Sequence, residues 1–357
     1  MSRLVMKFGG TSLADLERIR RVATLVAAEA AAGRQVVVVV SAMAGKTNEL
    51  VAWTDGAGAA TGAVGCSDEE YDAVVASGEQ VTAGLLAMTL RNAGLAARSW
   101  MGWQVPIITD ESHGRARIDE VGSERLSAAL DAGEIAVVAG FQGVTRGGRL
   151  TTLGRGGSDT TAVAVAAAIK AACCDIYTDV DGVYTTDPRI EPKARRLGAI
   201  SYEEMLEMAS LGARVLHTRS VELAMSQRVP IRVLSSFGAA GAPATRGTVV
   251  CDEEEIVEKR IVSGVTYSRD EAKISLFGLP DHPGVSSEIF GRLADANVNV
   301  DMIVQSHARG EGAANMEFTV SKRDAARAVA VVTAARDAIG YQELTLDDEV
   351  AKVSVIG

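Results

Sequence analysis

The sequence predicts an α/β protein in two parts: a mainly parallel sheet between helices, followed by a smaller ferredoxin-like unit. In the first part, short apolar segments alternate with stretches of helical spacing, which is typical of parallel sheets. In the second part, the order changes to strand, helix, strand, strand, helix, strand, as in a ferredoxin-like unit. A chain of 357 residues is also too long for one typical domain.

The first strand, helix and strand are encoded at the start of the chain. Residues 4–8 form a short apolar strand, and a glycine turn leads into a helix with apolar positions at helical spacing. Ser12 and Asp15 have the S-x-x-D spacing of a helix start. Residues 35–41 are a valine run, as expected of a parallel strand covered on both faces.

The same alternation continues toward residue 235. We expect further strands at residues 135–141, 175–178 and 231–234. The helices expected between them are residues 77–93, 123–132, 159–172 and 202–227. The adjacent Cys173 and Cys174 are predicted to end the 159–172 helical stretch.

A change of composition separates the two parts. A Gly/Ala segment at 238–243 precedes an acidic stretch, which places a boundary near residue 250 and gives a first domain of residues 1–250. The ferredoxin-like unit is expected at 261–348. Its strands are predicted at residues 273–278, 298–305, 314–321 and 343–346, and its helices at 284–296 and 324–339.

One short internal repeat lies in the second part. Residues 272–278 recur 79 residues later as residues 351–357. We interpret residues 349–357 as the opening strand of a second unit that is missing by truncation or by nature. The alternative is a coincidence of ordinary strand composition.

Composition and charge exclude several classes of protein. With 46 acidic and 36 basic residues the net charge is −10, which disfavours nucleic acid and anionic membranes as general partners. No apolar run approaches the roughly 20 residues of a spanning helix and no signal peptide is evident, so we expect a cytoplasmic protein. The four cysteines and four histidines lack metal-ligand spacing, which predicts reduced thiols and no metal site. With 4% aromatics and 36 glycines, an enzyme for small polar substrates is favoured.

The turn after the first strand is suited to phosphate. Lys7 supplies a cation, Gly9 and Gly10 allow close approach, and hydroxyls follow at a helix start. The alternative is an ordinary glycine turn. The segment is not a dinucleotide fingerprint, and Gly45-Lys46-Thr47 is not the end of a P-loop, because Val40 stands where that motif needs glycine.

Residues 151–161 concentrate special residue types before a helix. Arg155 lies in a glycine-rich loop and can hold a substrate carboxylate in a bidentate fork. Asp159 can help to hold Mg²⁺ or another cation. Glu79, near the start of the 77–93 helix, either pairs with a substrate ammonium or merely faces the helix dipole. The loop at 177–189 either binds a purine through its backbone or is a surface turn.

Four segments together resemble the aspartate kinase family, whose members phosphorylate the β-carboxylate of L-aspartate: residues 7–12, Ser41-Ala42-Met43, residues 151–161 and 178–189. The resemblance extends over the whole chain. It implies an amino-acid-kinase fold followed by an ACT regulatory domain with an effector loop at residues 281–284. It also implies a second ACT unit, which residues 261–267 would join and of which this chain has only residues 349–357.

The resemblance also implies roles for particular residues. Lys7, Asp159 and Arg155 would act in catalysis. The substrate L-aspartate would be held by Ser41, Thr47, Glu79, Phe141 and Arg155. ATP, with Mg²⁺, would be held by Lys7, Gly9, Gly10, Ser158, Thr178, Asp179, Tyr184, Asp187, Arg189 and Arg214. Arg214 stands where the family commonly has lysine. The positive charge is kept, but the forked guanidinium of arginine differs in geometry from the ammonium of lysine.

The implied reaction needs no general base, because a carboxylate is already ionised at neutral pH. It would be the first step of lysine, threonine and methionine biosynthesis. Lysine or threonine would bind a half-site at Asp281, Pro283, Gly284, Asp301 and Gln305. With the second unit missing, we expect weakened or absent inhibition. Exposed strand edges predict a homodimer through the ACT domains.

Two other functions remain open on the sequence. The same fold serves kinases of glutamate, acetylglutamate, carbamate and uridylate. A non-catalytic amino-acid sensor with a degenerate kinase domain is the other alternative. The presence of Lys7, Arg155 and Asp159 together disfavours the sensor.

Overall fold

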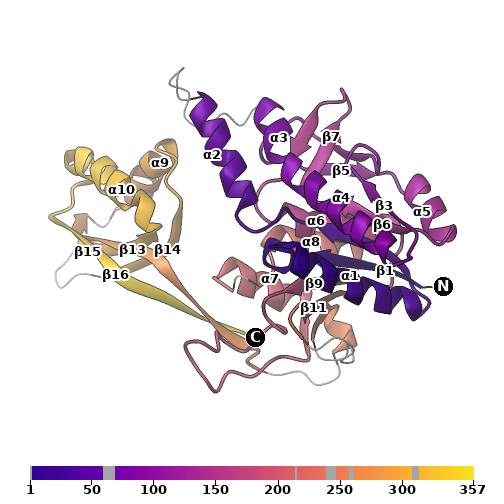
Figure 1. Cartoon of the computed structure of the whole chain (residues 1–357). Coiled ribbons are helices and arrows are strands. Elements are labelled where there is room, and N and C mark those ends of the chain that lie inside the picture. The colour runs from indigo at the N-terminus through magenta and orange to yellow at the C-terminus, as the bar shows by residue number, and fades with distance from the viewer. Residues whose placement is uncertain are drawn as a thin grey trace. The chain divides into compact units, whose positions relative to one another are not determined.

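Figure 1 shows the computed structural model, which describes residues 2–58, 69–213, 215–238, 247–256, 261–280, 282–307 and 313–357. The chain divides into two compact units. The first unit comprises Met1–Val265 together with Val355–Gly357, and the second comprises Thr266–Ser354. The mixed α/β class with a mainly parallel sheet is confirmed.

An eight-stranded sheet organises the first unit, in the order β10-β12-β11-β9-β1-β2-β6-β3. Its recorded neighbours are parallel except β11 and β12, which are antiparallel. Because β1 lies between β9 and β2, it is buried in the middle of the sheet. The strands are β1 (Arg3–Phe8), β2 (Gln35–Val40), β3 (Ala97–Trp100), β6 (Ile135–Ala139), β9 (Cys173–Thr178), β10 (Ala199–Ser201), β11 (Ile231–Ser235) and β12 (Thr248–Cys251).

Side-chain alternation along the strands builds a core on each face of this sheet. Val5 and Val37 belong to one core, and Met6 and Val38 belong to the other, as the two-residue period of a strand requires. The helices around the sheet are α1 (Leu16–Ala31), α4 (Ser77–Asn92), α5 (Glu124–Asp131), α6 (Gly157–Ala168), α7 (Tyr202–Ser210) and α8 (Thr218–Gln227). Helices α1 and α4 pack on the face of Met6, whereas α5, α6, α7 and α8 pack on the face of Val5.

The structure corrects two helix predictions. The expected helix at 202–227 is two helices, α7 and α8, because the chain turns at Gly212, where φ is +119°. Ser12 does not cap the first helix. It lies in a 3₁₀ turn, η1 (Gly10–Leu13), and Asp15 caps α1 by accepting a 2.8 Å hydrogen bond from the Arg18 N–H.

The adjacent cysteines are also placed differently. Cys173 and Cys174 begin β9 instead of ending a helix. Both are free thiols. Burial raises the pKa of Cys173 to about 12, so its side chain stays protonated.

A small sheet that the sequence did not predict lies beside the main one, in the order β5-β4-β7-β8. Its strands have only three or four residues each, too few for a periodic pattern. They are β4 (Ile107–Thr109), β5 (Ile118–Val121), β7 (Gln142–Thr145) and β8 (Leu150–Thr152). Other elements that the sequence did not predict include β3, β10 and β12 of the main sheet and the helices α2 (Lys46–Gly58) and α3 (Glu69–Val75).

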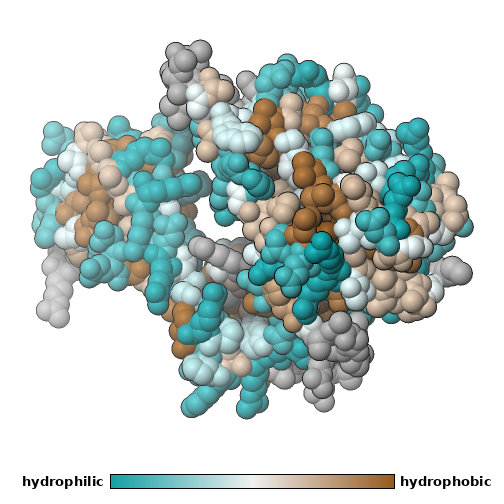
Figure 2. All heavy atoms as spheres, viewed as in Figure 1, coloured by the Kyte–Doolittle hydropathy of each residue, from teal (hydrophilic) through white to brown (hydrophobic). Residues whose placement is uncertain are grey.

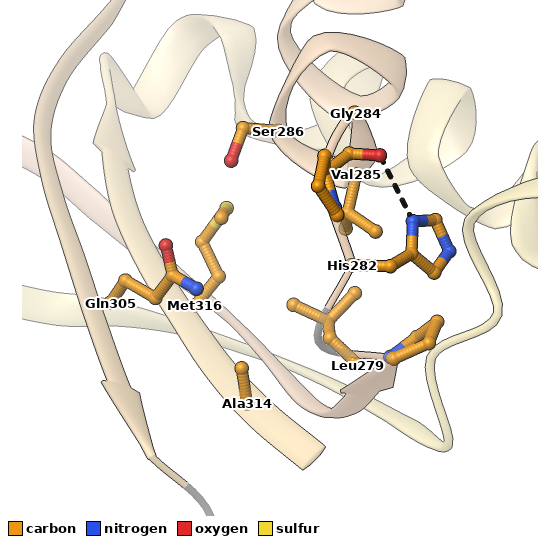
Figure 3. Close-up of a pocket in the computed structure, with 10 residues that line it drawn as sticks. Leu279, His282, Gly284, Val285, Ser286, Gln305, Ala314 and Met316 are labelled. Carbon is orange, nitrogen blue, oxygen red and sulfur yellow. Dashed lines mark hydrogen bonds between the residues drawn. The ribbon is translucent and has the colours of Figure 1, made fainter. Parts of the chain in front are cut away.

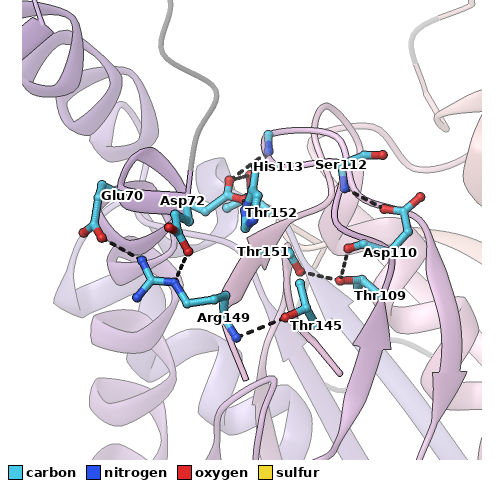
Figure 4. A network of polar contacts seen from close by, with 12 residues as sticks. Glu70, Asp72, Thr109, Asp110, Ser112, His113, Thr145, Arg149, Thr151 and Thr152 are labelled. Atoms are coloured by element: carbon cyan, nitrogen blue, oxygen red, sulfur yellow. Dashed lines mark hydrogen bonds and ion pairs between the residues drawn. The ribbon is translucent and has the colours of Figure 1, made fainter. Parts of the chain in front are cut away.

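A buried carboxylate ties α3 to this small sheet (Figure 4). Asp72 is fully buried, and its carboxylate accepts hydrogen bonds from the Gly114 N–H at 3.0 Å and from the Thr152 hydroxyl. The His113 Nδ1 lies 2.7 Å from the same carboxylate. Each oxygen therefore has partners, as a buried charge requires.

One helical stretch of the described chain, Glu69–Asn92, is long and apolar enough to cross a membrane by length and composition alone. Half of it is buried inside the protein, where α4 packs against α1 and β3. Its exposed apolar side chains include Val81 and Met88. Figure 2 shows a hydrophobic, brown area on the first unit where Figure 1 labels α4. This extent of burial is typical of a helix that packs in the core of a protein.

The second unit has the predicted strand and helix order. Its sheet runs β14-β15-β13-β16, with one core of its own. Its elements are β13 (Gly264–Pro280), α9 (Val285–Asp295), β14 (Val300–His307), β15 (Ala313–Val320), α10 (Lys322–Ala334), α11 (Arg336–Ile339) and β16 (Glu343–Ile356). The residues expected to open a further unit, 349–357, are the second half of β16 and the residue after it. The fully buried Ile356 accepts a 2.8 Å main-chain hydrogen bond from the Ser263 N–H. A 3₁₀ turn, η3 (Glu253–Glu255), precedes Ser263 in the chain.

Removing the Asp72 carboxylate is expected to destabilise the first unit. In Asp72→Ala, the buried Thr152 hydroxyl and the half-buried Gly114 N–H and His113 lose their acceptor. We expect the free energy of unfolding to fall by about 3–5 kcal/mol, measured by urea denaturation. Glu111→Ala, which removes an exposed carboxylate from the same loop, is the control and is expected to change it by less than about 0.5 kcal/mol. Equal effects of the two substitutions would contradict this account.

Candidate active site

The carboxyl ends of the parallel strands meet at one edge of the main sheet, where ligands bind in open α/β folds. Three hydrogen bonds extend the ladder just beyond this edge. The Ser41 N–H donates to the Phe8 carbonyl at 3.1 Å, and the Ser236 N–H donates to the Thr178 carbonyl at 3.0 Å. The Gly140 N–H donates to the carbonyl of the last residue of β2 at 3.0 Å. Residues after β1, β2, β6, β9 and β11 are therefore brought together.

An ion pair joins β1 to α6 at this edge. The Lys7 Nζ lies 2.6 Å from the Asp159 carboxylate, and the two side chains are only 12% and 14% exposed. Lys7 points to the same face of the sheet as Val5, which is the face that α6 covers. Between Gly157 and Ala166, every residue of α6 except Asp159 is buried. The helix therefore places one carboxylate over the β1 ammonium.

Glycines provide the space around this pair. A Cβ on Gly9 would lie 3.5 Å from the Lys7 Nζ, and one on Gly10 would lie 2.9 Å from the Ala42 carbonyl. A side chain at Gly9 would contact the ammonium, and one at Gly10 would push away the chain that follows β2. The glycine turn thus leaves room for a ligand beside the Lys7 ammonium.

Glu79 is a buried carboxylate with one unused oxygen. Its Oε1 accepts a 2.9 Å hydrogen bond from the Ala42 N–H, whereas its buried Oε2 has no hydrogen-bond partner. The side chain is 2% exposed. Burial raises the pKa of Glu79 from its ordinary 4.5 to about 7, and the Ala42 N–H opposes this shift only in part. A cationic ligand group would satisfy the free oxygen.

The loop before α6 presents Arg155. Gly154 and Gly156 have φ of +75° and +74°, and the Arg155 side chain between them is exposed. Phe141 lies in the next loop, with φ of +67°, and its N–H donates to the Thr161 hydroxyl at 3.1 Å. This hydroxyl belongs to α6, so the loop after β6 is fixed to the start of that helix.

Ser158, in the first turn of α6, faces the same loop. It is 8% exposed, and a Cβ on Gly140 would lie 2.9 Å from its hydroxyl. Contacts therefore connect the predicted residues Lys7, Gly9, Gly10, Ser41, Glu79, Phe141, Ser158 and Asp159 into one site.

The predicted nucleotide residues after β9 mostly have local partners. The Thr178 hydroxyl donates to Asp179 at 3.0 Å, and the Tyr184 hydroxyl donates to Asp181 at 2.8 Å. Asp187 pairs with Arg189, whose side chain is 88% exposed. Thr47 is half-buried in the first turn of α2. Arg214 lies outside the described residues.

Some contacts at this edge were missed by the sequence analysis. The Ser12 hydroxyl bonds to the Ser236 hydroxyl at 2.8 Å and so joins the turn after β1 to the end of β11. The only sequence signal was that Ser236 follows a predicted strand. His217, just before α8, and Arg219, in its first turn, contact the loop of Arg155, and no sequence motif marked them.

A cavity of about 320 Å³ lies in the second unit, between the start of α9 and the strands (Figure 3). Of the predicted effector residues, Pro283, Gly284 and Gln305 line it. Asp301 is outside the lining and pairs with Lys352. Asp281 lies outside the described residues. The other lining residues are Leu279, Pro280, His282, Val285, Ser286, Ala314 and Met316.

Known proteins match this chain over both units. The amino acid kinase family matches residues 2–235, and an ACT domain family matches residues 274–335. An aspartate kinase of Pseudomonas putida is 49% identical over 100% of this chain and 84% of its own length. The crystal structure of Escherichia coli aspartokinase III in complex with lysine and aspartate has a TM-score of 0.79 and 29% identity, covering 99% of this chain and 87% of that one.

The same Escherichia coli enzyme in complex with aspartate and ADP has a TM-score of 0.75, at the same identity and coverage. The relatives and the solved structures agree with each other. The chain belongs to the amino acid kinase family, among its aspartate kinases with an ACT region.

Proposed function

We propose that the protein transfers the γ-phosphoryl group of ATP to the β-carboxylate of L-aspartate, giving 4-phospho-L-aspartate and ADP. The observation that carries this proposal is the buried Glu79 with its unused Oε2, because a cationic partner such as a substrate ammonium stabilises its ionised form. The Lys7–Asp159 pair lies at the same edge of the sheet.

Phosphoryl transfer depends mainly on positioning and on neutralising charge. Lys7 neutralises charge on the transferred phosphoryl group, and the glycines beside it let the phosphates approach. Asp159 holds the Lys7 ammonium in place. The attacking carboxylate is ionised at neutral pH, so the site needs no general base.

The amino-acid end of the substrate is held by opposite charges. Glu79 binds the ammonium, and the Arg155 guanidinium binds the α-carboxylate in a bidentate fork. Thr47, Ser41 and Phe141 complete this part of the site. With both ends of the zwitterion fixed, the β-carboxylate is directed toward the phosphates.

The nucleotide lies along the carboxyl ends of β1 and β9. Gly9, Gly10 and Ser158 face its phosphates, and Thr178 and Asp179 begin the loop that receives the base. Tyr184, Asp187, Arg189 and Arg214 complete the proposed ATP site. Among the described residues no three His, Cys, Asp or Glu side chains converge. We therefore assign Mg²⁺ to the ATP phosphates, where it neutralises charge, with Asp159 as the nearby carboxylate.

The second unit supports a homodimer. On its edge strand β14, Met302, Ile303 and Val304 are 46%, 50% and 47% exposed. An exposed apolar edge strand favours pairing with another copy. We place the enzyme in the cytoplasm, at the first step of lysine, threonine and methionine biosynthesis, with no nucleic acid or membrane partner.

Turnover with defined acceptors tests the proposed reaction. We expect hydroxylamine to trap an acyl phosphate from ATP, Mg²⁺ and L-aspartate, but not with L-glutamate, uridylate or no acceptor. Lys7→Gln is expected to lower kcat by about 10²–10³-fold because it removes the phosphate cation. Lys170→Gln, at an exposed lysine, is the control. Turnover with another acceptor would overturn the assignment, and aspartate binding without turnover would favour the sensor.

The raised pKa of Glu79 predicts a pH dependence of substrate binding. The ammonium needs ionised Glu79, so the Kd for aspartate is expected to rise about tenfold for each pH unit below about 7. Glu79→Gln is expected to weaken binding by at least about 30-fold and to remove this dependence. Calorimetric titration across pH measures both. A wild-type Kd that stays constant from about pH 5 to 8 would contradict the role of Glu79.

The same substitution is expected to stabilise the free protein at high pH. Since the folded-state pKa is raised, the stability contribution of Glu79 is present below its ordinary pKa and is lost as pH rises through about 7. At about pH 8, Glu79→Gln should therefore unfold with a free energy about 3 kcal/mol higher than wild type. At about pH 4 the difference should vanish. Glu254→Gln, at an exposed carboxylate, is the control.

We also propose that the cavity of the second unit is an effector half-site for lysine or threonine. We expect one of them to bind, and Gln305→Ala to weaken that binding about tenfold by removing an amide from the lining. Calorimetry with each amino acid measures this, with Thr333→Ala on the exposed face of α10 as control. Unchanged binding in Gln305→Ala would exclude this cavity.

A further inference from the structure

The loop that carries Arg155 has little conformational preference of its own. It contains Gly154, Gly156 and Gly157, and the first two have positive φ. Glycine is the residue that loses most conformational freedom when it is fixed. A bidentate contact with a carboxylate nevertheless requires a well-defined guanidinium position. Contacts from other elements must therefore fix this loop.

Arg219, in the first turn of α8, binds the chain just before the loop. Its guanidinium donates to the Leu153 carbonyl and to the Ala116 carbonyl, both at 2.6 Å. The Ala116 N–H in turn donates to the Thr152 carbonyl at 2.9 Å. One half-buried guanidinium thus connects the end of β8 to the segment that precedes β5.

Burying the Arg219 guanidinium at this contact has a desolvation penalty. Burial lowers the pKa of Arg219, and Arg117 nearby lowers it further, while Asp110 and Glu222 act in the opposite direction. The recorded hydrogen-bond acceptors of Arg219 are both main-chain carbonyls. A partly desolvated cation is therefore used to hold the backbone at the base of the Arg155 loop.

Other contacts enclose the same loop beyond Arg155. A Cβ on Gly156 would lie 2.3 Å from the Cγ of His217, so the imidazole lies directly against the loop. A Cβ on Gly154 would lie 3.1 Å from the Gly114 carbonyl, and the Gly114 N–H is bound to Asp72. His217, just before α8, and Arg219, in its first turn, therefore support the loop on both sides of Arg155.

We propose that Arg219 is a positioning residue that sets the Arg155 guanidinium for the α-carboxylate of the amino-acid substrate. The inference rests on the proposed function and adds a residue to it. Arg219 does not touch the substrate. It acts by fixing the Leu153 and Ala116 carbonyls, so that Arg155 starts from one backbone position. A looser loop weakens the carboxylate fork more than it weakens nucleotide binding.

Arg219→Met tests this, because methionine keeps an apolar stem and removes every donor. We expect the KM for aspartate to rise about 10- to 100-fold and the KM for ATP to change less than about twofold. Arg219→Lys keeps a cation with one compact donor group and should recover part of the loss. Arg125→Met, at an exposed arginine of α5, is the matched control. Equal increases in both KM values would overturn the proposal.

A double-mutant cycle separates positioning from general stability. If Arg219 acts through Arg155, Arg219→Met should change the KM for aspartate less than about twofold in an Arg155→Met background. Additive effects in the cycle would overturn the proposal. If Arg219→Met does not fold, Arg219→Lys is carried through the same cycle with the same criteria. Failure of the proposed function can be distinguished from failure of the Arg219 proposal, because the wild-type protein itself would then show no aspartate-dependent turnover.

Discussion

The ion pair between Lys7 and Asp159 is the constraint on which the site depends. Two largely buried charges are stable only while they face each other, since either one alone would leave an uncompensated charge beside the core. The pair therefore fixes the start of α6 over β1, in the middle of the sheet. The helix can be so fully buried because its residues are mostly small and apolar. The ion pair and the packing of α6 thus both fix the start of this helix at the phosphate end of the site.

Ala42 plays the corresponding part at the amino-acid end. Gly10 approaches its carbonyl, Gly78 approaches its side chain, and its N–H binds Glu79. A Cβ on Gly78 would lie 2.8 Å from that of Ala42, so α4 can reach the end of β2 only through glycine. This close approach excludes water from Glu79 and leaves it poorly compensated until a ligand binds. The poorly compensated carboxylate raises the free energy of the ligand-free protein, and substrate binding removes this penalty.

The sequence predicted the central strands and the main charged residues, because these have strong local signals. The valine run of β2 and the glycine-flanked Arg155 are visible within a few residues. The small sheet was missed because strands of three or four residues have no period to read. The contact between Ser12 and Ser236 joins distant segments, so a local cap was predicted in its place. The repeat at 351–357 correctly indicated a strand, but a pattern of that length carries no information about which sheet the strand joins.

The path of the chain between the units has a consequence for synthesis. Val355–Gly357 belong to the first unit although all of the second unit precedes them in the sequence. Ile356 is fully buried in the core that also contains Tyr202, Met205 and Met208. A ribosome that makes the chain from its N-terminus delivers Ile356 only after the whole second unit has emerged. The first unit therefore begins to fold before the second but gains Ile356 only after residues 266–354 have been made, so the second unit can form while that core still lacks this side chain.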